Sequence, residues 1–597
     1  MKELEYPFDS SFILKKKKSL RRVLLSDGSG RIQKKIAVLG GSTTHDIKDI
    51  LELFLLNYGI EPVFYESEYA QYFSDIMFDN EELVSFKPDL IFIHTTTRNI
   101  KSFPKMSDSE TQIQEILQNE YNSFEMMWEK IASAYGCPVI QNNFEPPFFR
   151  LLGNKDFSDA HGRVRFVNLL NEKFAEYART HENFYINDIN YLAGCFGLQK
   201  WADSFYWHMY KYALSFEAIP EFAFNLANII KSIYGKNKKA LVLDLDNTLW
   251  GGVVGDDGAD NIEIGQETPL AQLYSEFQSY IKAHKEIGVL LAVDSKNDEE
   301  NALAGLRRPD SVLSRDDFVS FKANWNTKSD NIFEIARELN LGADSFVFVD
   351  DNPAEREIVR SQSKGTAVPE MTDGTGQDIS KFINILDRSG FFEVTQFSSD
   401  DLKRSDMYIA NAGRAKLEAS FDNYRDYLLS LQMNAEILPF SPLYMGRIAQ
   451  LTNKSNQFNL TTKRCTQADI EKMAADENFI TLYGKLSDKF GDNGVVSVVS
   501  GHIDGKNFHI DLWLMSCRVL KRDMECAMMD ELVKKCSERK IEKVIGYYYP
   551  TAKNKMVKDF YELRGFVKES EDADGNSTWV LGGLDCYKNQ NSVINVN

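Results

Sequence analysis

The sequence predicts a multidomain α/β protein, and three observations lead to this prediction. The chain has 597 residues, which is too long for one hydrophobic core, so three or four domains are expected. Its first two thirds alternate short aliphatic runs with stretches of helical spacing, a pattern typical of parallel sheets covered by helices. Its last third changes to longer runs that favour a β-hairpin and an α+β domain.

Composition and charge narrow the class of function. The formal net charge is −19, which argues against nucleic acid as a partner because phosphates would be repelled. No long uncharged apolar run is present, so no membrane span is expected. The start, Met1 to Glu5, lacks the order of a signal peptide. The seven cysteines form no Cys-x-x-Cys pair, so a reducing, cytoplasmic location is expected.

The first predicted domain, residues 1–234, reads as a parallel sheet. Its expected strands lie at 35–39, 60–66, 89–94 and 137–143. Ser42 follows the first strand in a glycine-rich turn and Asn142 ends a later one, which loosely resembles an SGNH hydrolase of flavodoxin-like fold. The resemblance implies Ser42 as nucleophile and Asn142 as an oxyanion contact. The expected Asp-x-x-His is missing, since Asp203 and His208 have the wrong spacing, and a binding or docking role is favoured.

The second domain, residues 235–395, is predicted around a buried strand at 240–243. This strand ends in Asp244-Leu245-Asp246. In an open α/β sheet, chemistry takes place just beyond the carboxyl ends of the strands. Two carboxylates there can share a magnesium ion, and one can attack while the other moves a proton.

Three further polar elements follow strands or begin a helix in the same domain. The strand at 287–293 is followed by Asp294-Ser295, whose hydroxyl can hold a phosphate oxygen. Lys328 stands at a helix start and can neutralise an aspartate and a phosphate. The strand at 345–349 ends in Asp350-Asp351. Each element alone has an ordinary explanation as a cap or surface charge, but the ordered set predicts a phosphate site with Mg²⁺.

These elements resemble the four motifs of the haloacid dehalogenase (HAD) superfamily, which implies a Rossmann-like domain. The short stretch between the first two strands leaves no room for a large cap, and 253–258 reads as a turn-rich, hairpin-like excursion. The implied roles are Asp244, Asp246 and Asp294 in catalysis, Asp244, Asp246, Asp350 and Asp351 as metal ligands, and Ser295, Lys296, Asn297 and Lys328 as phosphate contacts.

Four segments make the resemblance more specific within this superfamily: 245–258, 295–298, 324–328 and 348–357. Together they are similar to the FkbH family, HAD subfamily IIIC. The resemblance implies an enzyme that takes a three-carbon unit from 1,3-bisphosphoglycerate and removes its phosphate. It then loads glycerate as a thioester on the phosphopantetheine thiol of an acyl carrier protein.

Position 294 departs from the family pattern. The family commonly has a cysteine before the Ser-Lys-Asn motif, proposed to carry the glyceryl group, whereas this chain has Asp294 and no cysteine between Cys195 and Cys465. A carboxylate cannot form a thioester. Either the chain was altered here, or acyl transfer goes directly to the carrier thiol, or the enzyme is a phosphohydrolase or uses another acyl phosphate. Alternatively, Asp294 caps a helix and has no catalytic role.

The last third is predicted to hold a helical connector, residues 396–434, and a domain at 435–597. The hairpin at 494–501 and 508–514 and the ending at 554–566 resemble the GNAT acetyltransferase fold. Residues 518–523 lack the glycines that let a backbone approach a pyrophosphate. Recognition of a phosphopantetheine arm is therefore favoured over acetyl transfer, with Cys517, Arg518 and Lys521 as its site and Arg522 near the phosphate.

Overall fold

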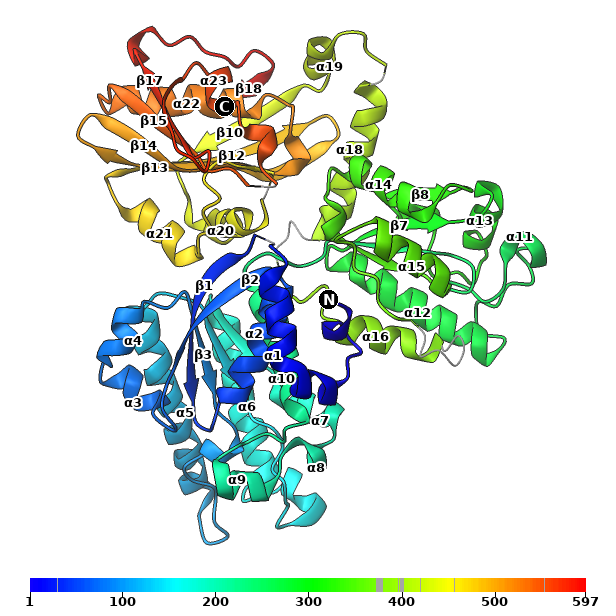
Figure 1. Cartoon of the computed structure of the whole chain (residues 1–597), viewed down its shortest axis with the longest axis vertical. Helices are drawn as coiled ribbons and strands as arrows, with labels where there is room; N and C mark the ends of the chain where they lie inside the picture. The colour runs from blue at the N-terminus through cyan, green and yellow to red at the C-terminus, as the bar shows by residue number, and fades with distance from the viewer. Residues whose placement is uncertain are drawn as a thin grey trace. The chain divides into compact units, whose positions relative to one another are not determined.

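The computed structural model describes residues 1–28, 30–371, 379–395, 397, 402–418, 420–455, 457–551 and 553–596. The chain divides into two compact units, residues 1–233 and 234–597 (Figure 1). The first residues of the predicted connector, 396 and 398–401, lie outside the described ranges. Within those ranges no helix combines the length and the apolar character that crossing a membrane requires.

The first unit contains one five-stranded sheet in the order β2-β1-β3-β4-β5, and every neighbouring pair is parallel. The strands are β1 Ile32–Gly40, β2 Ile60–Glu66, β3 Leu90–His94, β4 Val139–Asn142 and β5 Phe184–Asn187. This is the flavodoxin-like order, so the predicted parallel sheet is confirmed. The strand order reverses between β1 and β3, which is where such sheets leave a crevice at their carboxyl ends.

Helices cover both faces of this sheet. Ile91 and Ile93 of β3 belong to the core that contains Trp128 and Phe174, whereas the alternate side chains, Phe92 and His94, contact Phe222 on the other face. The helices are α1 Ser10–Ser26, α2 His45–Asn57, α3 Tyr72–Met77, α4 Glu81–Phe86, α5 Glu110–Ala134, α6 Arg163–Thr180, α7 Ile189–Phe196, α8 Leu198–Trp201, α9 Ser204–Tyr210 and α10 Ala218–Ile233.

The second unit begins with a four-stranded parallel sheet in the order β8-β7-β6-β9. Its strands are β6 Ala240–Leu243, β7 Leu290–Ser295, β8 Ser320–Ala323 and β9 Phe346–Val349. The segment between β6 and β7 is fully described and holds just two helices, α11 Val254–Asp257 and α12 Pro269–Glu286. The predicted absence of a large cap is confirmed. The predicted excursion is closed by an antiparallel bridge between Gly251 and Glu263, and within it the short helix α11 forms, with Gly258, whose φ is 81°, as its C-cap.

The remaining helices of this part follow β7, β8 and β9 in turn. They are α13 Glu299–Leu306, α14 Lys328–Leu339, α15 Pro353–Gln362 and α16 Phe382–Arg388, and α18 Arg404–Glu418 and α19 Tyr424–Ser430 lead to the third sheet. Lys328 is the first residue of α14, whose N-cap Thr327 accepts a hydrogen bond from the Asp330 N–H. The helix start therefore holds this lysine at the carboxyl end of the sheet.

The third sheet has nine strands, eight in the order β16-β17-β15-β14-β13-β12-β10-β18, with β11 paired to β14. The predicted hairpin is confirmed as β13 Gly491–Asp504 and β14 Asn507–Met515. The other elements are β10 Met433–Leu438, α20 Met445–Lys454, β11 Phe458–Asn459, α21 Gln467–Ala475, β12 Phe479–Asp488, α22 Met524–Glu538, β15 Lys543–Tyr548, α23 Phe560–Leu563, β16 Val567–Glu571, β17 Ser577–Gly582 and β18 Ile594–Val596. The sheet is mostly antiparallel, with β14–β15 and β10–β18 as parallel pairs, and the helices packed on it make this an α+β domain, as predicted.

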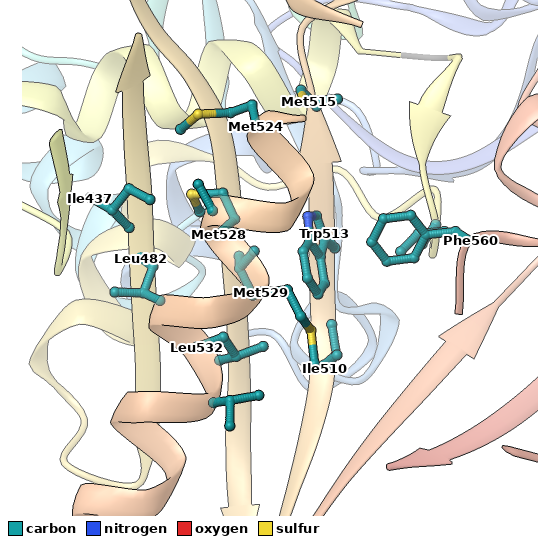
Figure 2. Close-up of a cluster of buried hydrophobic side chains, with 14 of the residues drawn as sticks. Ile437, Leu482, Ile510, Trp513, Met515, Met524, Met528, Met529, Leu532 and Phe560 are labelled. Carbon is teal, nitrogen blue, oxygen red and sulfur yellow. The ribbon is translucent and has the colours of Figure 1, made fainter. Parts of the chain in front are cut away.

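Helix α22 packs closely on this sheet. Its methionines lie over Leu482 and Trp513 (Figure 2). A Cβ added at Gly484 of β12 would lie 2.3 Å from Met524 Cε and 2.6 Å from Met528 Sδ. The glycine therefore gives the helix its close approach, and the flexible thioethers fill the space that remains.

Candidate active site at the carboxyl ends of the middle sheet

The strand register brings three aspartates side by side. Leu243 of β6 pairs with Val293 of β7 and with Val349 of β9. The residues that follow, Asp244, Asp294 and Asp350, therefore lie on three adjacent strands at the same edge of the sheet. The Asp244 N–H donates to the Val349 carbonyl oxygen at 2.9 Å, which continues the pairing by one residue.

Three carboxylates and one lysine form the centre of this site. One oxygen each from Asp244, Asp350 and Asp351 lie within 4.8 Å of one another. Lys328 Nζ is 2.9 Å from Asp244 Oδ1 and also binds Asp350 Oδ2. The lysine is only 2 % exposed. Carboxylate oxygens are the hard ligands that Mg²⁺ prefers, so this donor set fits that ion.

Burial and charge act in opposite directions on these groups. Burial raises the pKa of Asp350, and the neighbouring Asp244 charge raises it further, while Lys328 lowers it. Burial lowers the pKa of Lys328, but Asp244 and Asp350 together outweigh it, and the net shift is upward. The lysine therefore remains a cation within a cluster of acids.

The Asp246 carboxylate does not point toward Lys328 and the other aspartates. Its Oδ1 accepts hydrogen bonds from Trp250 Nε1 at 2.8 Å and from the Val254 N–H at 3.0 Å, and its Oδ2 accepts one from Asn297 Nδ2 at 3.0 Å. The described residues do not bring this carboxylate into the group formed by Asp244, Asp350 and Asp351. Burial raises its pKa, which suits a proton-transfer role. Asn297, predicted to contact phosphate, orients this carboxylate instead.

Ser295 and Lys296 take different positions although they are neighbours. Ser295 is buried, and its carbonyl oxygen accepts hydrogen bonds from the Asn297 and Asn324 N–H groups, both at 3.1 Å. Lys296 is exposed and forms an ion pair with Glu355 at 2.6 Å. A phosphate contact from Lys296 would require this ion pair to open, whereas Ser295 already lies at the end of β7.

Asp294 is fully buried beside the aspartate–lysine cluster. Its Oδ1 accepts a hydrogen bond from Asn331 Nδ2 at 2.8 Å, and its Oδ2 has no hydrogen-bond partner. Burial raises the pKa of this carboxyl group to about 8, against the opposing effects of Asn331 and Lys328. Asp298 is the N-cap of α13, so the alternative reading of Asp294 as a helix cap is wrong.

Two residues that support the site were missed by the sequence analysis. Asn331 lies three residues after Lys328, on the same side of α14, and holds Asp294. Arg356 is buried, and its Nη1 donates to the carbonyl oxygens of Asp350 at 2.9 Å and Asp351 at 2.7 Å. The helical spacing from Lys328 is a signal for Asn331, while no sequence pattern distinguishes Arg356 from a surface arginine.

Comparison with known proteins shows the family to which the chain belongs. The model of the FkbH N-terminal domain matches residues 35–231. The structure is also similar to a crystal structure of the N-terminal part of the protein BF1531 from Bacteroides fragilis, which contains a phosphatase domain complexed with Mg. The identity is 30 %, the match covers 64 % of this chain and 99 % of the other, and the TM-score is 0.59. The chain belongs to the FkbH family.

Two other solved structures also match the FkbH chain over about a quarter of its length. Ard1 from Thermoplasma volcanium is 20 % identical over 25 % of this chain and 97 % of its own, with a TM-score of 0.20. The ribosomal-protein-S18-alanine N-acetyltransferase from Escherichia coli is 10 % identical over 26 % and 99 %, also with a TM-score of 0.20. No curated protein sequence matches the chain.

In the N-terminal FkbH domain no hydrogen bond joins the two predicted residues, Ser42 and Asn142. Ser42 Oγ is buried and has no hydrogen-bond partner. Asn142 Nδ2 donates to His94 Nδ1 at 2.9 Å and to the Thr95 carbonyl oxygen at 3.1 Å. Asp203 caps α9. No described base contacts Ser42, so the residues form no catalytic triad.

The predicted pantetheine site of the FkbH chain lies in one turn after β14. The Cys517 carbonyl oxygen accepts a hydrogen bond from Asn340 Nδ2 at 3.0 Å, and Arg518 Nε donates to Ser516 Oγ at 3.2 Å. Lys521 is exposed. Arg522 is buried and binds Asp488, Asn411 and the Arg518 carbonyl oxygen. The expectation that Arg522 serves a phosphate is corrected, because its guanidinium is already occupied.

Proposed function

We propose that this FkbH-family protein is a Mg²⁺-dependent, HAD-type phosphatase and glyceryltransferase. Its substrate is 1,3-bisphosphoglycerate, and its product is glycerate held as a thioester on an acyl carrier protein. The observation that carries the proposal is the aspartate–lysine cluster, with Asp244, Asp350 and Asp351 around Lys328. The Mg-bound phosphatase domain of the B. fragilis protein supports it.

Each residue of the site has a separate role in the proposed dephosphorylation. Asp244, Asp350 and Asp351 would hold Mg²⁺, which when bound neutralises phosphoryl charge. Asp244 attacks phosphorus and the phosphoester P–O bond breaks, while Asp246 donates a proton to the leaving oxygen. Asp246 then takes a proton from the water that hydrolyses the aspartyl phosphate. Lys328 and Ser295 hold the phosphoryl oxygens.

The acyl step proceeds without a protein thiol. Asp294 occupies the position of the expected cysteine, and it is fully buried. In the proposed reaction the carrier thiolate attacks the acyl carbon directly, the bond to the acyl phosphate oxygen breaks, and inorganic phosphate leaves. The same aspartate favours a second candidate, a phosphohydrolase that acts on another substrate and loads no carrier.

Intact-mass measurement of the carrier tests the proposal. After incubation with 1,3-bisphosphoglycerate, Mg²⁺ and a phosphopantetheinylated cognate carrier, we expect the carrier mass to rise by one glyceryl group. We expect no rise in EDTA. An unchanged mass, with a carrier that another acylating enzyme can load, contradicts the transferase. Phosphate release without a mass change favours the phosphohydrolase.

A cysteine at position 294 is expected to restore a protein-bound intermediate. In Asp294→Cys the thiol lies beside Asp244 and Ser295, and we expect a glyceryl thioester on residue 294 that hydroxylamine removes. Peptide mass spectrometry identifies the adduct. Asp294→Ser is the matched control, since it is of similar size and forms no thioester. An Asp294→Cys variant that loads the carrier without any adduct contradicts this expectation.

A further inference from the structure

Arg98 lies at the switch point of the first sheet, just after β3, and it interacts electrostatically with the buried Glu145 without forming an ion pair. Its guanidinium carbon is 5.5 Å from the centroid of the Phe148 ring and 5.0 Å from that of the Trp207 ring of α9. Its Nε is buried without a hydrogen-bond acceptor. Among the described residues no carboxylate forms an ion pair with it. Two aromatic faces therefore hold a cation whose hydrogen-bond donors are free.

A second cation lies over the same tryptophan. Lys211 Nζ is 5.6 Å from the centroid of the Trp207 ring, and no described carboxylate lies within ion-pair distance of it. The chain has 88 acidic and 69 basic residues, so two neighbouring cations that form no ion pair are unexpected. The nearby carboxylate of Glu145 is fully buried and accepts hydrogen bonds from Thr97 Oγ1 at 2.8 Å and the Thr97 N–H at 3.3 Å.

The glycine-rich turn after β1 carries the Ser42 hydroxyl, which has no hydrogen-bond partner, and is joined to the segments of Arg98 and Lys211. The Gly41 carbonyl oxygen accepts from Asn99 Nδ2 at 2.8 Å, and the Thr43 N–H donates to the Lys211 carbonyl oxygen at 3.0 Å. Ser42, between these two anchors, is 2 % exposed, and its Oγ has no hydrogen-bond partner. The turn is thus fixed to the segments that carry Arg98 and Lys211.

The two segments whose rings hold the Arg98 guanidinium also carry other exposed aromatic side chains. The segment after β4 carries Phe148 and Phe149, and α9 carries Phe205 and Tyr210. Their exposed fractions are 37, 60, 63 and 53 %. Large apolar side chains gathered in the open near unpaired cations mark a binding surface more often than a solvated one.

We propose that Ser42, Arg98, Phe148, Trp207 and Lys211, the Arg98 cluster, bind a small amphiphilic anion. The carboxylate or phosphoryl head of the ligand contacts the guanidinium, the ammonium and the serine hydroxyl. Its apolar body lies on Phe148 and the exposed aromatic side chains. A guanidinium accepts either head in a bidentate arrangement, and the crevice at a topological switch point is where open α/β sheets hold ligands. This inference is independent of the proposed phosphatase.

The competing explanation is that Arg98 merely braces the two rings. The two explanations differ in what a loss of charge does. Arg98→Met keeps much of the apolar stem, so a brace would lose some stability, whereas a binding site would lose affinity for anions.

Calorimetric titration of the full chain with octyl phosphate, octanoate and the neutral octyl glucoside, all below micelle formation, tests the proposal. We expect at least one anion to bind and the glucoside not to bind. Arg98→Met should weaken anion binding at least about tenfold, as expected for a charge-assisted pair. Lys211→Met should weaken it several-fold, and Arg22→Met, a change at an exposed arginine of α1, should leave it unchanged. Added salt should weaken it as well.

The outcomes separate the possibilities. A preference for octyl phosphate or for octanoate identifies the head group. Binding of neither anion, equal binding of the glucoside, or anion binding that both variants leave intact overturns the proposal. If Arg98→Met fails to fold, Lys211→Met decides alone. Phosphate release by the Mg²⁺-loaded variants should equal that of the unmodified protein, which keeps this test separate from the aspartate site.

Discussion

Asp244→Asn is expected to lower Mg²⁺-dependent phosphate release by about 10³-fold or more, since in the proposed mechanism the residue supplies both the attacking oxygen and a metal ligand. An amide oxygen is a weak nucleophile, and it carries no charge to balance Lys328. The side chain keeps its size, so the sheet edge should keep its structure. Steady-state phosphate release from 1,3-bisphosphoglycerate, with and without carrier, measures the loss.

Asp316→Asn is the matched control for this measurement. Asp316 is exposed in the same domain, so its amide should leave phosphate release within a factor of about two. If Asp244→Asn keeps more than a tenth of the activity, the residue is not the nucleophile. If carrier binding persists while the unmodified protein releases no phosphate, the chain acts as a docking scaffold.

Lys328→Met is expected to lower the free energy of unfolding by about 3–5 kcal/mol in the absence of Mg²⁺. The lysine lies between Asp244 and Asp350 and is almost fully buried, so its removal leaves two carboxylates without a compensating charge. Mg²⁺ at about one hundred times its dissociation constant should return about 2.7 kcal/mol by binding the folded state. Denaturant unfolding with Mg²⁺ and with EDTA measures both the loss of unfolding free energy and the part that Mg²⁺ restores.

Lys322→Met removes a half-buried lysine of the same domain and provides the control. Lys322 is 17 % exposed and pairs with the exposed carboxylates of Glu334 and Glu338, and pairs with solvent-exposed carboxylates contribute about 1 kcal/mol or less. Mg²⁺ should stabilise the Lys322→Met variant no more than it stabilises the unmodified protein. A Lys328→Met variant as stable as Lys322→Met would show that the buried aspartates are neutral without the lysine.

The positions of the aspartates at the strand ends could be predicted because they depend on local pattern. An aliphatic run predicts a buried parallel strand, and the carboxyl ends of such strands meet at one edge. The direction of the Asp246 side chain could not be predicted in this way. It depends on the Trp250 indole and on the Val254 N–H at the start of α11, where the sequence favoured a turn. Asn331 reaches Asp294 from 37 residues away, and no periodicity connects the two.

In the third sheet, too, features set by local sequence could be predicted and those set by residues far apart in the chain could not. The hairpin of β13 and β14 was predictable because Gly505, with φ of 59°, joins two long alternating runs. Strand β11, Phe458–Asn459, has two residues and pairs with Met515 and Leu514 of β14. Two residues carry no periodic signal, so this pairing could not be found before the fold was known.

The short connection between β6 and β7 has a kinetic consequence. Many enzymes of this size enclose their substrate under a mobile domain, whose opening then limits the release of product. Here α11 and α12 are the two elements of that connection, and neither forms a separate cap domain. In the proposed reaction, turnover should therefore follow the chemical step and the departure of the carrier, so that its rate responds to carrier concentration and to substitutions at the aspartates more than to solvent viscosity.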